Sequence, residues 1–253
     1  MIEESLLFWC LAIFVVYIIG VSKSGFAGGA GVIAVPLMSI VISPQAAAAL
    51  LLPILLFIDA LNMRVFWPKR DAVLLPRLLL GSFFGVVIGA LCFGLFNVTI
   101  VKIIVGFVAV ICAANNMNNR QKLLKPVSVI ESIIWSVLSG FASFICHAGG
   151  PPINAYMLKL SLNKITLLST IAVFAGITNL MKLPAYAILG QLNINVGWFA
   201  FAMAPIAYAG VYSGMRVKDL ISDETYMIIL NRVLLVVGFY LITTNTTVLF
   251  LSV

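Results

Sequence analysis

The chain has very few charged residues for its size. Only 9% of its 253 residues are charged, whereas 63% are apolar, and an average soluble domain carries about a quarter charged residues. A water-soluble globule with this composition could not keep its surface hydrated. A disordered chain, a secreted disulfide scaffold and a free nucleic-acid-binding domain are excluded for the same reason. The composition therefore predicts a protein that is solvated by lipid, with membrane lipid and not nucleic acid as a partner.

Groups that carry catalysis or bind metals are also scarce. The chain has one histidine and four cysteines, and the cysteines lie in apolar stretches without a CxxC motif. No GxxxxGK motif is present, which argues against direct use of ATP. One carboxylate, Asp59, lies well inside an apolar stretch, too few for paired carboxylates or a nucleophile with its base. We therefore expect no metal, no cofactor, no catalytic residue and no enzyme activity.

Long apolar runs make up most of the chain. Helices satisfy their own backbone groups in lipid, and the runs lack the alternation of barrel strands. The sequence therefore predicts an all-α polytopic membrane protein with about 8–10 transmembrane segments. The N-terminus has no basic start or cleavage site, so the first run should remain as a span. The ten runs cover 5–21, 26–42, 45–65, 72–96, 98–114, 128–146, 152–161, 165–189, 196–215 and 225–249, of which 26–42 and 152–161 are short enough for half-helices.

The basic residues gather in alternate loops. Apart from Lys102, the other set of loops is almost free of Lys and Arg. Because basic loops stay in the cytoplasm, both termini are expected on the outer side, and 119–126 is expected to be a cytoplasmic linker. The basic set is Arg64, Lys69, Arg70, Arg120, Lys122, Lys125, Lys159, Lys164, Arg216 and Lys218.

Short matches in the same order along the chain suggest an internal duplication, at offsets that begin at 115 residues and rise to 125. The matches are Gly25-Phe26-Ala27 with Gly140-Phe141-Ala142, Pro36 with Pro151, Phe57 and Asn62 with Phe174 and Asn179, and Gly85 and Gly89 with Gly210 and Gly214. They predict two repeats, 1–118 and 127–253. Five segments in each half is an odd number, so the halves should be inverted repeats with interrupted helices, a transporter architecture. The glycine pairs would pack within one chain or between two chains of a homodimer.

The first candidate binding segment is a glycine-rich break after the first span. Its glycines let a ligand approach the backbone, and a helix that starts there directs free N–H groups at an anion. Alternatively, the glycines serve close helix packing and Lys23 snorkels to the cytoplasmic interface. The candidate substrate-binding residues are Lys23, Ser24, Gly25, Phe26, Gly28 and Gly29.

The second candidate segment, 146–154, contains two prolines in tandem. Proline cannot continue a helix but suits the first turn of a new one, so a second helix start is expected here. His147 either donates to an anionic substrate, carries a proton for coupling, or packs as an ordinary side chain. The other candidates are Gly149, Gly150, Pro151 and Asn154.

Ionisable residues inside spans are costly and need a reason. Asp59 lies near Asn62, and Lys182 follows Asn179, in corresponding regions of the two halves. Asn62, Asn179 and Lys182 are therefore further candidates for substrate binding. Asp59 is a proton-coupling site, a salt-bridge partner of Lys182, or part of a structural bridge. Arg232, in the last run, either neutralises substrate or lies near the cytoplasmic interface.

The run GFAGGAGVIAVP from Gly25 to Pro36, its echo from Gly140 to Pro152, and the two similar halves resemble the TauE/SafE family of sulfite and organosulfonate exporters. The resemblance covers essentially the whole chain. It implies transport of sulfite, sulfoacetate or a related sulfur-containing anion across the bacterial inner membrane. The residues independently favour an anion, whereas sulfur comes from the resemblance alone.

The sequence thus predicts a secondary transporter for a small anion, sulfite or a small sulfonate, with alternating access at a site between the repeats. Proton coupling and facilitated diffusion are both compatible with it. An anion channel or a membrane subunit of a larger complex is the alternative.

Overall fold

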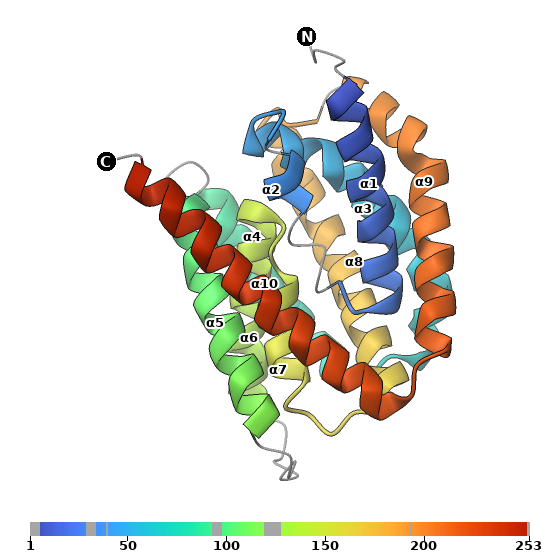
Figure 1. Cartoon of the computed structure of the whole chain (residues 1–253). Coiled ribbons are helices and arrows are strands. Elements are labelled where there is room, and N and C mark those ends of the chain that lie inside the picture. Colours follow the sequence, from blue (N-terminus) through green and yellow to red (C-terminus); the bar gives the residue numbers. More distant parts are fainter. Residues whose placement is uncertain are drawn as a thin grey trace.

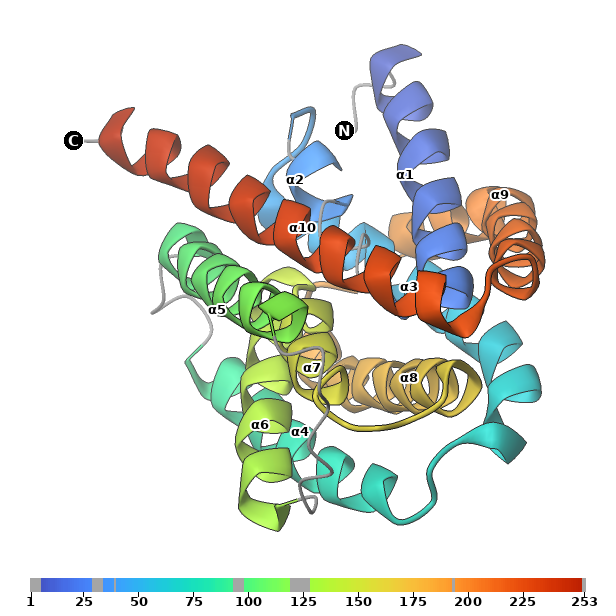
Figure 2. The ribbon, with the colours of Figure 1, turned by 60° about the horizontal axis from the view of Figure 1, so that its bottom comes forward.

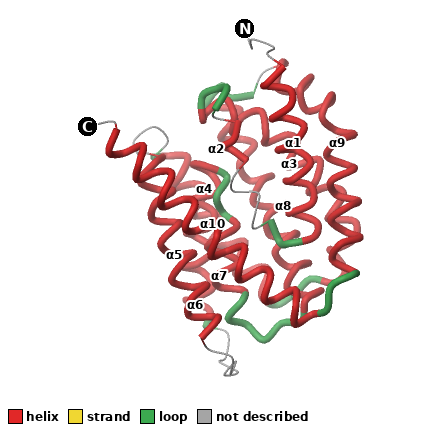
Figure 3. The backbone as a smooth tube through the Cα atoms, in the orientation of Figure 1, coloured by secondary structure: helices red, strands yellow, loops and turns green. Residues whose placement is uncertain are grey.

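The computed structural model describes residues 6–28, 34–38, 40–92, 98–118, 128–192 and 194–251, and every regular element in these ranges is a helix (Figure 3). Each of the ten predicted runs corresponds to one α-helix, which confirms the all-α fold class. The helices are α1 (Leu6–Gly25), α2 (Ala34–Met38), α3 (Pro44–Phe66), the 3₁₀ turn η2 (Trp67–Lys69), α4 (Leu74–Leu91), α5 (Val98–Asn118), α6 (Val129–Cys146), α7 (Gly150–Met157), α8 (Lys164–Ile188), α9 (Ile194–Asp219) and α10 (Asp223–Leu251).

Two of these helices are too short to cross a membrane. α2 has 5 residues and α7 has 8, and eight helical residues extend only about 12 Å against a hydrocarbon core of about 30 Å. The runs at 26–42 and 152–161 are therefore half-helices. Among the described residues, 7 helices are long and apolar enough to span: α1, α3, α4, α6, α8, α9 and α10. α5 has 21 residues and a shorter apolar stretch, Lys102–Ile111.

Large apolar side chains cover the outward faces of the helices. Leu91 is 77% exposed, Phe201 75% and Ile130 72%. A large, continuous apolar surface of this kind marks contact with a membrane. The composition, the long helices and the apolar exterior together identify a multi-pass membrane protein.

The long helices pack in pairs that are far apart in the sequence. α1 lies along α9, α4 along α6, α5 along α10, and α3 along α8 (Figures 1 and 2). The predicted glycines lie at these crossings: a Cβ added to Gly85 would be 2.2 Å from Val137 O on α6, and one added to Gly210 would be 2.5 Å from Tyr17 O on α1. These glycines therefore serve helix packing within one chain. They give no support to a homodimer, which stays a prediction.

The start of α1 and the end of α10 lie at the same end of the molecule (Figure 1). The last turn of α9, which carries Arg216 and Lys218, lies at the opposite end. This arrangement agrees with termini on one side and basic residues on the other. The predicted linker 119–126 lies outside the described residues.

Candidate functional site

α1 and α6 end in the same backbone motif. Gly28 N donates to Ser22 O at 2.9 Å, and Ala148 N donates to Ala142 O at 3.2 Å, in each case to the carbonyl six residues earlier. Ala27 (φ 52°) and His147 (φ 54°) adopt the left-handed conformation that these turns require, which is uncommon for residues other than glycine. Both breaks predicted from the sequence are therefore present.

A cavity of about 70 Å³ lies between the two breaks. This volume holds a few water molecules or one small anion. Its polar side chains are Lys23, Ser139, Ser143, His147, Thr178 and Asn179, and its backbone wall includes Ala27, Gly28, Gly149 and Gly150. The cavity therefore brings residues of both halves of the chain to one place.

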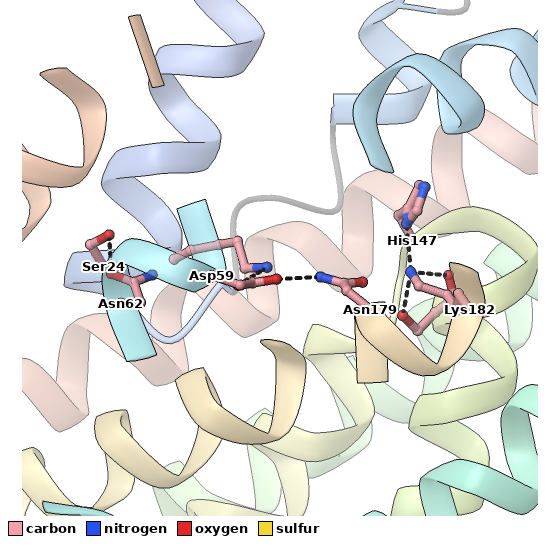
Figure 4. A network of polar contacts seen from close by, with 8 residues as sticks. Ser24, Asp59, Asn62, His147, Asn179 and Lys182 are labelled. Atoms are coloured by element: carbon pink, nitrogen blue, oxygen red, sulfur yellow. Dashed lines mark hydrogen bonds and ion pairs between the residues drawn. The ribbon is translucent and has the colours of Figure 1, made fainter. Parts of the chain in front are cut away.

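One side of the polar network is an ion pair (Figure 4). Lys23 Nζ at the end of α1 lies 2.5 Å from Asp59 Oδ1 of α3. Asn179 Nδ2 of α8 donates to the other carboxylate oxygen, Oδ2, at 2.6 Å. Lys23 is 8% exposed, Asp59 2% and Asn179 5%. Asp59 therefore holds two residues that line the cavity, and its partner is Lys23 rather than Lys182, the pairing considered from the sequence.

The other side of the network centres on Lys182, which is fully buried. Its ammonium donates to Ser143 O at 3.2 Å, to Ser143 Oγ at 3.1 Å and to His147 Nδ1 at 2.9 Å. No carboxylate lies within ion-pair distance of Lys182 in the described part of the chain. The hydrogen-bond partners of Lys182 Nζ are therefore all neutral groups.

These contacts also assign the proton on His147. The carbonyl oxygen of Ala48 can only accept, so Nε2 carries the proton and donates to it at 3.0 Å, which leaves Nδ1 to accept from Lys182 Nζ at 2.9 Å. The ring is then neutral, and protein groups occupy both of its nitrogens. In this arrangement His147 lines the cavity with its ring and positions Lys182.

A row of serines on α6 was not predicted from the sequence. Ser139 Oγ donates to Gly149 O at 2.7 Å and ties α6 to the start of α7, while Ser143 binds Lys182. The row is Ser132, Ser136, Ser139 and Ser143, all buried. Its three- and four-residue spacing places the row on one helix face, and this spacing was the available signal.

The start of α7 is closely packed against this row. A Cβ on Gly149 would lie 2.8 Å from Ser139 O, so only glycine fits there. Pro151 and Pro152 have no N–H group, and the first turn of α7 therefore offers fewer free donors than a helix start normally does. The side chains contribute more to this site than the helix terminus that the sequence suggested.

The predicted site residues fall into three sets. Those that line the cavity are Lys23, Gly28, His147, Gly149, Gly150 and Asn179. Those that lie outside the cavity lining are Ser24, Gly25, Phe26, Asp59, Asn62, Pro151, Asn154 and Lys182. The third set is Gly29 alone, which lies outside the described residues.

Several residues of the second set have structural partners. Ser24 Oγ donates to Asn62 Oδ1 at 2.8 Å. A Cβ on Gly25 would be 2.8 Å from Gly214 O of α9, so this glycine serves helix packing. Phe26 stacks on Tyr226 with ring centroids 6.1 Å apart.

Arg232 is exposed on α10 and lines a separate apolar groove with Leu37 of α2. It is absent from the lining of the central cavity. Arg232 therefore does not reach a substrate in the central cavity, and its place near the cytoplasmic interface stays a prediction.

Comparison with protein families agrees with the resemblance drawn from the glycine-rich segments. The family described as "Sulfite exporter TauE/SafE" matches residues 12–241, nearly the whole chain. No curated protein and no solved structure matches the chain. Membership of a transporter family also agrees with the expectation of a transport protein rather than an enzyme. The chain belongs to the TauE/SafE sulfite exporter family of membrane proteins.

Proposed function

We propose that the protein is a secondary transporter that carries sulfite or a small organosulfonate such as sulfoacetate through the cavity between the two breaks. The observation that carries this proposal is the balance of ionisable groups. Lys23 and Lys182 place two basic side chains at the cavity, and Asp59 is the one carboxylate paired with either of them among the described residues. A buried ammonium without a carboxylate partner is costly, so an anion is the ligand that would stabilise Lys182 in its charged form.

The volume of the cavity supports a small anion. About 70 Å³ suits sulfite or the head group of a sulfonate. The donors that surround it are an ammonium, hydroxyls and an amide, which bind the oxygens of such a group. The expectation that the substrate contains sulfur comes from the family. The expectation that it is small and negatively charged comes from the cavity.

Alternating access between inverted repeats is part of the same proposal. The bond between Asp59 and Asn179 joins residues 120 positions apart, and the same separation relates Ala27 to His147 at the breaks. It also relates the helix-capping residues Ser43 and Asn163. The helix pairs α1–α9 and α6–α4 correspond under this relation. This separation is longer than the offset of 115 that matched Ala27 with Ala142, so the proposed repeats 1–118 and 127–253 align Ala27 with His147.

Counterflow into liposomes tests the substrate class. Purified protein should let internal sulfite drive the uptake of labelled sulfoacetate, because one site serves both anions in turn. The panel should include taurine, oxalate and lactate as competitors. Flux of sulfite without exchange would favour the channel alternative, and a panel in which no anion exchanges would contradict the transporter proposal.

Lys182→Met should weaken anion binding without removing the fold. The substitution deletes a buried cation that has no carboxylate partner, and methionine fills a similar volume, so the apo protein should remain folded. The thermal stabilisation by sulfite, measured in detergent, should fall by most of its value. Lys102→Met is a matched control, because Lys102 is also buried, at 7% exposure, but lies on α5 outside the cavity lining. An equal loss in both variants would show that Lys182 has no special role.

A further inference from the structure

We propose that Asp59 is a built-in competitor of the transported anion. In the empty cavity its carboxylate occupies the two donors that an incoming anion needs, Lys23 and Asn179. This inference rests on the proposed function and adds how the same site is regulated.

The geometry of the donors is the basis of the proposal. Lys23 and Asn179 line the cavity, whereas Asp59 does not. Each carboxylate oxygen of Asp59 engages one of them, Oδ1 with Lys23 at 2.5 Å and Oδ2 with Asn179 at 2.6 Å. An anion that enters the cavity therefore meets an ammonium and an amide that already bind a carboxylate. It must share these donors with Asp59 or displace it.

The charges around Asp59 make this competition strong. Asp59 is 2% exposed, so water screens its repulsion of a second anion only weakly. Removing the charge of Asp59 would remove this repulsion and release Lys23 for the anion.

The other titratable groups near Asp59 do not replace it in this role. α1 presents Lys23, α8 presents Lys182, and His147 lies across the cavity with both nitrogens bonded. α2 carries no titratable residue over 34–38. The charged residues of the remaining neighbours lie at helix ends: Lys69 of η2 is exposed, Arg216 of α9 donates to Tyr212, and Lys218 of α9 pairs with Asp219.

Binding of methanesulfonate, measured by calorimetry in detergent, tests the proposal. This anion keeps its charge over the whole working pH range, so any pH dependence belongs to the protein. Asp59→Asn should bind it at least about tenfold more tightly than the wild type near neutral pH, because a like charge is removed. Asp219→Asn is the matched control: it breaks another ion pair of 2.5 Å, at a side chain that is 63% exposed, and should leave the affinity unchanged.

The direction of the change in affinity separates competition from a merely structural role. Competition predicts tighter binding when the charge of Asp59 is removed, whereas loss of a structural bond to Lys23 and Asn179 predicts weaker binding. Asp59→Ser removes the same charge and serves if Asp59→Asn does not fold. Weaker or unchanged binding in these variants overturns the inference alone. A wild type that binds neither methanesulfonate nor sulfite overturns the proposed function and this inference with it.

Discussion

Replacing Lys23 by alanine is expected to reduce anion uptake into proteoliposomes by about ten- to a hundredfold. Lys23 is the cation that lines the cavity, and a charged hydrogen bond to a buried ligand is worth about 1.5–3 kcal/mol, more when the site stays dry. Initial rates of labelled sulfite uptake, normalised to the amount of protein inserted, measure the effect.

The same substitution has a cost for folding that must be separated from its cost for transport. Alanine at position 23 leaves Asp59 buried without its cation, and breaking a buried pair in this way costs about 3–5 kcal/mol. The double variant Lys23→Ala/Asp59→Asn removes both charges and should recover most of the lost melting temperature. Transport should stay absent in the double variant, and an active double variant would remove Lys23 from the substrate site.

Gly85→Ala is expected to prevent α4 and α6 from packing. The new methyl group would lie 2.2 Å from Val137 O and 2.8 Å from Phe141 N, and neither backbone atom can move without the whole helix. Overpacking usually costs about 1–3 kcal/mol, and a clash with backbone belongs at or above the top of that range. We expect little monodisperse protein and a melting temperature lowered by about 5 °C or more, measured by size exclusion and thermal unfolding in detergent.

Gly197→Ala on α9 is the matched control for this prediction. Nothing lies within 4 Å of a Cβ at this position, and alanine favours helix over glycine by up to about 1 kcal/mol. The melting temperature should be unchanged or slightly raised. If the two alanine variants were equally stable, the close α4–α6 crossing would not be a requirement of the fold.

The sequence predicted the helices well because lipid leaves the backbone few choices. Apolar runs that end at turn residues or charges must satisfy their own hydrogen bonds, and ten such runs became ten helices. The length of the two short helices was harder to predict. The run 26–42 is apolar enough for a span, and it is the left-handed turn at Ala27 and Gly28, not composition, that interrupts it.

The sequence showed which segments form the site but not which side chains contact one another there. Lys23, His147 and Asn179 were recognisable because each is polar and lies in a span or at a break. The partner of Asp59 was not, because the choice between Lys23 and Lys182 depends on how α1, α3 and α8 are rotated against one another. Ser139 and Ser143 were missed because a serine in a helix can bond to its own backbone carbonyls, so it gives no sign of a cost that function must explain.

The long, oblique α10 makes the shape of the protein depend on its bilayer. Its 29 residues extend about 43 Å, well beyond a hydrocarbon core of about 30 Å, and the helix lies at an angle across α5 (Figures 1 and 2). The two helices touch at glycines, where a Cβ on Gly106 would be 2.8 Å from Gly238 O. A longer helix matches a thinner membrane by tilting, and this close crossing passes the tilt of α10 on to α5. Both helices contact α7, and the first residues of α7 line the cavity, so α7 connects the bilayer thickness to the site.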